Sequence, residues 1–163
     1  MTVSDEVRFL KESNAIEGVY DAESLVNAVV AWEYLKTQKK IFTHSILEAH
    51  GILMHGLLSE DEAGHFRRVE VTVGGRPTLK SQDVPAAIGE WRDQFEESIA
   101  RGEYPIPEHV AFEKIHPFVD GNGRVGRMLF NYQLFRIAKN RTQEFSPHIF
   151  YERDKQEYYK MFR

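Results

Sequence analysis

The sequence predicts an all-α fold, a compact helical domain that carries one short β-hairpin. Apolar residues recur at the spacing of an amphipathic helix through most of the chain, whereas strict alternation appears in a single stretch, VEVTVGGRPTL. The 163 residues, 42% of them hydrophobic, are enough for one domain with a buried core. We therefore expect a single domain over residues 1–163.

The first helix is expected over residues 4–17, capped by Ser4 or Asp5 and ended by Gly18 in the left-handed conformation. Two further helices should cover residues 22–38 and 43–58. The apolar residues of the earlier one repeat every three or four positions: Leu25, Val29, Trp32 and Leu35. Those of the later one repeat in the same way behind a capping Thr43: Ile46, Leu47, Leu53, Met54, Leu57 and Leu58.

The alternating stretch predicts a β-hairpin at residues 68–79. Val69, Val71 and Val73 alternate with polar residues, and the pair Gly74-Gly75 supplies the turn.

Helices are expected again after the hairpin. Asp83 caps a helix with Pro85 in its first turn, and Gly102 ends it. Its buried face should hold Ile88, Trp91, Phe95 and Ile99. Three more helical segments follow, at residues 107–116, 123–140 and 152–162.

Composition excludes several function classes. The net charge of −4 argues against general affinity for nucleic acid, because phosphate contacts need a basic surface. The absence of cysteine excludes disulfides and thiol catalysis. No signal peptide or membrane-spanning apolar run is visible, so we expect a cytoplasmic protein without a membrane partner. Export by a dedicated secretion machine would leave no mark in this sequence.

The stretch HPFVDGNGRVGR, residues 116–127, carries the chemistry. Pro117 disfavours helical geometry at His116, so a helix should stop at the histidine. Gly121 and Gly123 allow close backbone approach to a ligand, and Asn122 is a good cap for the helix that follows. The start of that helix presents free N–H groups and the positive end of the helix dipole, which together form an anion site.

Four side chains with suitable chemistry lie next to this anion site in the sequence. Arg124 and Arg127 lie three positions apart, on one face of the first turn. Asp120 offers a hard oxygen ligand for Mg²⁺, and His116 can take a proton near neutral pH. Each feature alone is usually a helix end, a turn or a solvated face. Together they suit a polyphosphate bound with its metal, beside a hydroxyl to be activated.

No other catalytic pattern competes with this stretch. The sequence holds no Walker-type loop, zinc-ligand spacing or serine elbow. The remaining histidines form no recognisable ligand set and are expected in the core or on the surface: His44, His50, His55, His65, His109 and His148.

The stretch resembles the signature of the Fic (Fido) family, H-x-F-x-D/E-G-N-G-R-x-x-R, with every specified position filled. The resemblance implies a Fic-type helical domain and a protein adenylyltransferase. Such an enzyme uses ATP with Mg²⁺ and transfers AMP to a Ser, Thr or Tyr hydroxyl of a target protein, itself included.

The resemblance also implies a role for each matched position. His116 is the general base that deprotonates the target hydroxyl. Asp120 is the ligand of Mg²⁺, and Phe118 is the core anchor of the loop. The anion hole is formed by Gly121, Asn122 and Gly123. The β- and γ-phosphates are held by Arg124 and Arg127.

In that family the hairpin resembles a flap over the nucleotide and a docking edge for the target segment. Its tip here comprises Val73, Gly74, Gly75 and Arg76. The alternative is a plain surface hairpin. Tyr158 and Tyr159, near the end of the chain, are candidates for the pocket of the base.

The segment SNAIEG, residues 13–18, places Glu17 at a helix C-terminus, where the dipole disfavours a carboxylate. Through Ser13, Glu17 and Gly18 it resembles the inhibitory motif of Fic proteins, S/T-x-x-x-E-G/N, here in an inhibitory helix at residues 1–18. The resemblance implies that Glu17 forms an ion pair with Arg127 and so blocks the position of the γ-phosphate. The alternative is an exposed helix-end glutamate, since Asn14 and Glu17 also have capping-box spacing.

We therefore expect an AMP transferase that is inhibited by its own N-terminus. Two alternatives stay open at this stage. The same site could remove AMP or transfer another phosphate-containing group, or the chain could be a nucleotide-sensing module with little turnover. The intact His116 argues against the module, because a binder needs no base.

Overall fold

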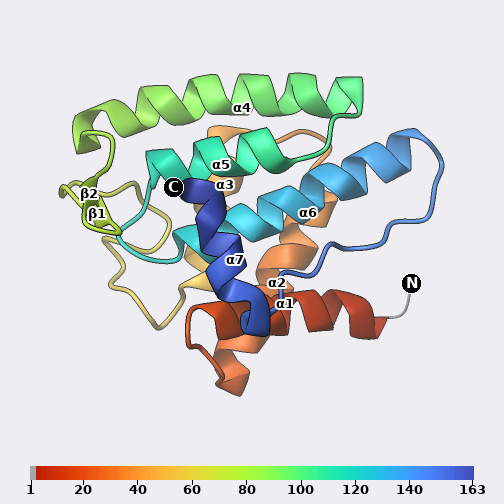
Figure 1. Cartoon of the computed structure of the whole chain (residues 1–163), viewed down its shortest axis with the longest axis horizontal. Coiled ribbons are helices and arrows are strands. Elements are labelled where there is room, and N and C mark those ends of the chain that lie inside the picture. Colours follow the sequence, from red (N-terminus) through yellow and green to blue (C-terminus); the bar gives the residue numbers. More distant parts are fainter. Residues whose placement is uncertain (1–2) are drawn as a thin grey trace.

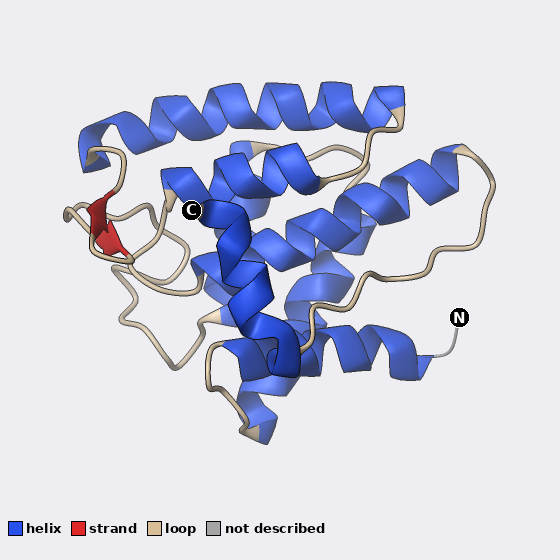
Figure 2. Ribbon diagram, viewed as in Figure 1, coloured by secondary structure: helices blue, strands red, loops and turns tan. Residues whose placement is uncertain are grey.

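The chain folds almost entirely into helices, and within residues 3–163, the part described by this computed structural model, the only sheet is a two-stranded antiparallel hairpin (Figures 1 and 2). The all-α prediction is therefore confirmed. The α-helices are α1 (Val3–Ile16), α2 (Ala22–Thr37), α3 (Thr43–Leu53), α4 (Val84–Arg101), α5 (Ile106–Ile115), α6 (Asn122–Asn140) and α7 (Lys155–Tyr159). The shorter elements are β1 (Thr72–Val73), β2 (Arg76–Pro77) and the 3₁₀ turns η1 (Ser81–Asp83), η2 (Glu152–Asp154) and η3 (Lys160–Phe162).

Helix α6 forms the centre of the molecule. Figure 1 shows it crossing the middle of the fold, with α5 and α4 above it and α1 below. Its residues are buried on every side from Arg124 to Gln133, as expected for a helix enclosed by others. Helices α2 and α3 pack against each other, and both also contact α6.

The C-terminal segment packs against the first helix of the chain. It packs on α1 through η2 and on α5 through η3, so α7 lies across the front of the fold in Figure 1. The β1–β2 hairpin projects at the edge where α4 begins. The start of α6 is therefore within reach of α1, α7 and the hairpin.

The local stop signals act as the sequence predicts. Gly18 and Gly102 have φ of +73° and +69°, the left-handed conformation that glycine adopts at little cost. Pro85 lies in the first turn of α4, and the predicted stripe of Ile88, Trp91, Phe95 and Ile99 is buried.

Several predicted boundaries were wrong. Positions 4 and 5 lie inside α1, which begins at Val3. Phe42, not Thr43, precedes α3, and its N–H donates to Ser45 Oγ. Helix α3 ends at Leu53, well before residue 58, because the chain turns at Gly56 with φ of +76°. The last predicted helix, residues 152–162, is divided into η2, α7 and η3.

The hairpin is shorter than the alternation suggests. Each strand has only two residues, paired as Thr72 with Pro77 and Val73 with Arg76 around the predicted Gly74-Gly75 turn. Proline at the end of the second strand cannot donate a ladder hydrogen bond, which limits the pairing. Val69 lies outside the strands and is exposed.

None of the helices within residues 3–163 is both long and apolar enough to cross a bilayer.

Candidate active site

The imidazole of His116 lies at the junction of α5 and α6. Helix α5 ends one residue before it, as Pro117 predicts, and His116 takes the left-handed conformation with φ of +52° and ψ of 63°. Its Nδ1 lies 3.3 Å from the carbonyl oxygen of Glu113, which favours a proton on Nδ1 and leaves Nε2 free to accept one. Burial lowers the pKa of His116, so the ring is neutral near pH 7.

Asn122 closes the loop after the histidine. Its side-chain oxygen accepts from the Phe118 N–H at 2.9 Å, and its amide group donates to the Phe118 carbonyl at 2.8 Å. The side chain therefore does not cap α6, which corrects that prediction. Gly121 occupies the cap position with φ of +86°. Phe118, which the resemblance makes the core anchor of the loop, is fully buried.

A buried histidine that the sequence did not single out supports this loop from α3. His50 Nδ1 accepts from the Gly64 N–H at 2.9 Å, so Nε2 carries the proton and donates to the Asp120 carbonyl at 2.8 Å. Its ring stacks on Phe118 with centroids 3.7 Å apart. Burial lowers the pKa of His50 to about 4, which keeps it neutral in this role.

The guanidinium of Arg127, on the first turns of α6, is buried and held from two ends of the chain. Nε donates to Ser13 Oγ at 2.8 Å, and Nη2 donates to the Ser13 carbonyl at 2.9 Å and to Glu17 Oε1 at 2.7 Å. Nη1 donates to the Tyr158 hydroxyl at 3.0 Å. The side chain of Arg127 is 1% exposed and that of Glu17 is 33% exposed, so the pair opens to solvent on the carboxylate side.

The Glu17 carboxylate lies against the N-terminal turn of α6. A Cβ added to Gly123 would collide with Glu17 Oε1 and would come 2.9 Å from Arg127 Nη1. Only glycine therefore lets an anion approach the helix start so closely. The N–H groups of this turn have no partner within the helix, and the dipole favours negative charge here. Glu17 thus marks the position of an anion site.

Arg124 is a second buried guanidinium beside this turn. Its Nη2 contacts Met54 Sδ at 3.3 Å, while Nε and Nη1 are buried without a hydrogen-bond partner. Burial lowers its pKa. Two unpaired donors on a buried cation fit a phosphate oxygen, because such groups are costly unless they are paired.

The only acidic residue of the loop is Asp120. It is exposed, and its Oδ1 accepts from the Gly121 N–H at 2.7 Å. Within residues 3–163 no group of three or more His, Cys, Asp or Glu side chains could hold a metal. One carboxylate does fit Mg²⁺ that arrives with substrate phosphates, because Mg²⁺ is commonly held by one or two carboxylates together with phosphate oxygens and water.

A cleft of about 520 Å³ lies between the hairpin, the start of α6 and the C-terminal segment. His116, Gly123, Arg127 and Glu17 line its floor. Its other walls come from the hairpin and the C-terminal segment: Thr72, Val73, Gly74, Arg76, Pro77 and Thr78, with Tyr158, Tyr159 and Phe162. Among the predicted residues, Gly75 forms the turn and does not line the cleft, and Asp120, Gly121, Asn122 and Arg124 lie outside its lining.

The cleft also contains an acid that sequence reasoning missed. Glu113, one turn before His116, has one buried carboxylate oxygen without a hydrogen-bond partner, although the residue as a whole is partly exposed. Burial raises its pKa to about 7, and the charge of Arg127 opposes that rise. Its position three residues before the histidine was the only signal that could have pointed to it.

Comparison with protein families gives a direct match. The model of the Fic/DOC family matches residues 41–134, more than half of the chain. The protein adenylyltransferase Fic of Drosophila willistoni is 28% identical over 98% of this chain and 32% of its own length. That of Drosophila virilis is 30% identical over 92% of this chain and 29% of its own length. The chain thus spans about a third of the curated relatives it matches.

Solved structures support the fold. Fic-1 from C. elegans superposes with a TM-score of 0.78 at 23% identity, over 98% of this chain and 55% of that one. A Fic domain containing signaling protein from Bacteroides thetaiotaomicron gives a TM-score of 0.76 at 19% identity, over 96% of this chain and 70% of that one. At these identities the likeness concerns the fold alone.

Proposed function

This chain belongs to the Fic/DOC family, and we propose that it is a protein adenylyltransferase, which transfers AMP from ATP to a Ser, Thr or Tyr hydroxyl of a protein. The relatives named protein adenylyltransferase Fic support this activity. The observation that carries the proposal is the arrangement of one cleft. A neutral histidine with a free Nε2 lies in the same cleft as an anion site formed by the α6 N-terminus and Arg127.

The residues divide the reaction between them. His116 Nε2 takes the proton of the target hydroxyl as its oxygen attacks the α-phosphorus of ATP. The bond from that phosphorus to the bridging oxygen breaks, so pyrophosphate leaves and AMP stays on the target. The N–H groups of α6, with Arg124 and Arg127, hold the phosphates and stabilise the charge that develops. Asp120 would hold Mg²⁺, which supplies further charge neutralisation when bound.

Glu17 acts against this reaction. Its carboxylate occupies the anion position over Gly123 and engages Nη2 of Arg127, which is the group that a γ-phosphate needs. ATP that binds beside Glu17 is therefore held in a non-productive pose. The N-terminal helix is in this proposal an inhibitory element, and displacement of Glu17 activates the enzyme.

Labelled ATP tests the proposal. The wild type, Glu17→Gly and His116→Ala proteins receive ATP labelled at either the α- or the γ-phosphate, together with candidate lysates. α-Label on protein that rises in Glu17→Gly and disappears when His116→Ala is added supports AMP transfer. Label from the γ-position alone overturns it in favour of phosphorylation. Release of AMP from a modified target, dependent on Glu17, would show the reverse activity, and tight ATP binding without any transfer would show a sensing module.

A further inference from the structure

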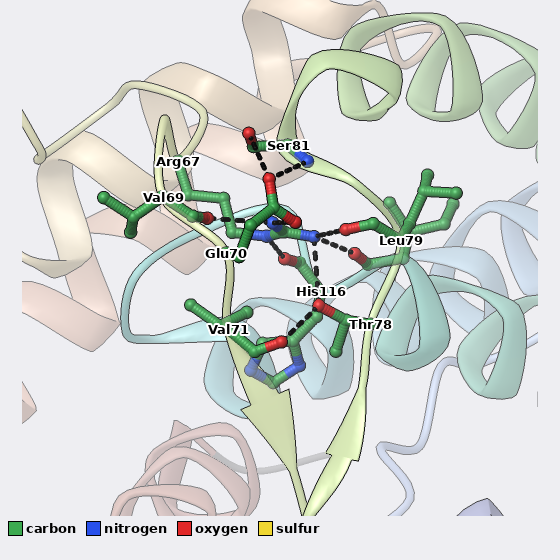
Figure 3. A network of polar contacts seen from close by, with 9 residues as sticks. Arg67, Val69, Glu70, Val71, Thr78, Leu79, Ser81 and His116 are labelled. Atoms are coloured by element: carbon green, nitrogen blue, oxygen red, sulfur yellow. Dashed lines mark hydrogen bonds and ion pairs between the residues drawn. The ribbon is translucent and has the colours of Figure 1, made fainter.

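Arg67 connects the loop of the catalytic histidine to the base of the hairpin. Its side chain is fully buried, with 0% exposed, between the two (Figure 3). On the histidine side, Nε donates to the His116 carbonyl at 2.7 Å and Nη2 to the Ile115 carbonyl at 3.3 Å. The backbone N–H of Arg67 donates to the Pro117 carbonyl at 2.9 Å. Three consecutive carbonyls at the end of α5 are therefore bonded to one residue.

The same guanidinium holds both arms of the hairpin. Nη1 donates to the Val69 carbonyl at 3.0 Å, before β1. Nη2 donates to Thr78 Oγ1 at 3.2 Å and to the Leu79 carbonyl, both after β2. The Thr78 hydroxyl in turn donates to the Val71 carbonyl at 2.8 Å, which joins the two arms directly. Figure 3 shows these contacts around one planar group.

The charge of Arg67 is balanced mainly by carbonyl dipoles. In the described part of the chain its one acidic contact is Glu70 Oε2 at 3.9 Å. The Glu70 side chain is 64% exposed and bonds Ser81 through its other oxygen. A buried cation with so weak a counter-charge is costly, and an apolar residue would often serve stability equally well. The fork geometry of arginine, in contrast, is needed to reach carbonyls on two sides at once.

The histidine backbone is the part that needs such support. His116 has φ of +52°, a region that non-glycine residues rarely adopt and that costs on the order of 1–3 kcal/mol. The direction of the imidazole depends on this conformation, because rotation of the backbone would turn Nε2 away from the cleft. The bond from Arg67 Nε to the His116 carbonyl fixes it directly.

We infer that Arg67 is a positioning residue that fixes the His116 backbone and the hairpin in one arrangement, so that base and flap face the cleft together. The inference rests on the proposed function for its catalytic consequence. Arg67 does not line the cleft and acts through His116, Val69, Thr78 and Leu79. Its loss should lower turnover without removing the phosphate-binding groups, which belong to α6.

The kinetic test uses Glu17→Gly as the parent, with Arg67→Met, Arg67→Lys and Thr78→Val added one at a time. In Arg67→Met we expect kcat to fall at least 30-fold while the Kd for ATP changes less than about threefold. Arg67→Lys keeps the charge but loses the fork, so it should recover only part of kcat. Thr78→Val removes the bonds of the Thr78 hydroxyl to Arg67 and Val71 but leaves the bond from Arg67 to the His116 carbonyl, so it should mainly raise the KM for the target. Arg68→Met, an exposed neighbour with the same change of charge, is the matched control and should resemble the parent.

Amide hydrogen exchange supplies a test that does not depend on activity. In Arg67→Met the N–H groups of Thr78 and His116, which bond the Val71 and Phe112 carbonyls, should exchange at least tenfold faster than in the parent, while α4 is unchanged. Unchanged exchange at both sites, or a loss of kcat matched by an equal loss of folded protein, would overturn the inference. A parent that transfers no AMP would sink the proposed function instead, and exchange would still decide the role of Arg67.

Discussion

Glu17 Oε1 and Arg127 Nη2 lie 2.7 Å apart although 110 positions separate them in the sequence. The helix dipole of α1 disfavours a carboxylate at this end by ~0.3–1 kcal/mol, and the contact with a buried cation offsets that cost. A phosphate that binds at α6 competes for the same guanidinium. In the proposed function the pair therefore links the position of α1 to nucleotide binding.

Glu17→Gly should raise AMP transfer, including self-modification, by at least tenfold, because Nη2 of Arg127 becomes available to the γ-phosphate. Without ATP the variant should be less stable by ~1–3 kcal/mol, because a buried donor loses its partner. Mg²⁺-ATP should restore part of this stability. Transfer assays and thermal melts measure both effects.

The control for this prediction is Glu60→Gly, which removes an exposed acid from a turn that does not line the cleft. It should change neither activity nor the response to ATP. Equal activity of Glu17→Gly and wild type would contradict the inhibitory role.

Arg124→Met should leave the stability of the nucleotide-free protein unchanged or raise it. Nε and Nη1 of Arg124 are buried without partners, so an apolar side chain of similar length removes a buried charge with two unpaired donors. The same change should weaken ATP binding by about 10- to 100-fold, because charge-assisted bonds to phosphate contribute ~1.5–3 kcal/mol each. Melting curves with and without Mg²⁺-ATP separate the two effects. The control is Arg101→Met, at an exposed position on α4, which should alter neither the stability nor the affinity for ATP. A large loss of stability in Arg124→Met would show that Arg124 has a structural role instead.

Tyr158→Phe should destabilise the protein by ~1–3 kcal/mol, because the hydroxyl has two buried partners. It accepts from Arg127 Nη1 at 3.0 Å and donates to His109 Nε2 at 2.9 Å. Burial lowers the pKa of His109 to about 3, so this ring is neutral and accepts the bond. Denaturant unfolding measures this loss of stability. Tyr159→Phe, at a more exposed position, is the control, and equal stability of the two variants would argue against the network.

The parts of the fold and site that local chemistry determines could be predicted from the sequence. Glycine ends α1 and α4, and proline ends α5 at His116. The signature names His116 and Arg127 and the inhibitory motif names Glu17, and the structure brings these three residues into one cleft. These features depend on residues within one turn of each other or on a recognisable pattern.

What could not be predicted depends on contacts between distant segments. His50 and Arg67 reach the catalytic loop from α3 and from the chain before the hairpin, and no periodicity marks them. The strands have only two residues each, and beyond them the Val69 and Leu79 carbonyls bond the Arg67 side chain. Asn122 had a plausible role as a cap, but its amide pairs with Phe118 four residues earlier.

Glu113→Gln should make the protein more stable above neutral pH. Burial raises the pKa of Glu113 from its ordinary value of 4.5 to about 7. The unfolded chain therefore loses this proton at a lower pH than the folded protein does. Between about pH 4.5 and pH 7 the folded state binds more protons, so the contribution of Glu113 to stability falls as pH rises. Above pH 7 the folded protein bears the full cost of a buried carboxylate, on the order of 3 kcal/mol.

Glutamine has nearly the same shape and does not titrate in this range. The free energy of unfolding should therefore be similar for Glu113→Gln and wild type near pH 4.5, and should diverge in favour of the variant up to about pH 7–8. Denaturant unfolding at several pH values measures this difference. Glu97→Gln, on the exposed face of α4, serves as the control because its carboxylate stays solvated in both states. A constant difference between Glu113→Gln and wild type across this range would mean that Glu113 is ionised in the fold with an ordinary pKa, compensated by the neighbouring charge of Arg127.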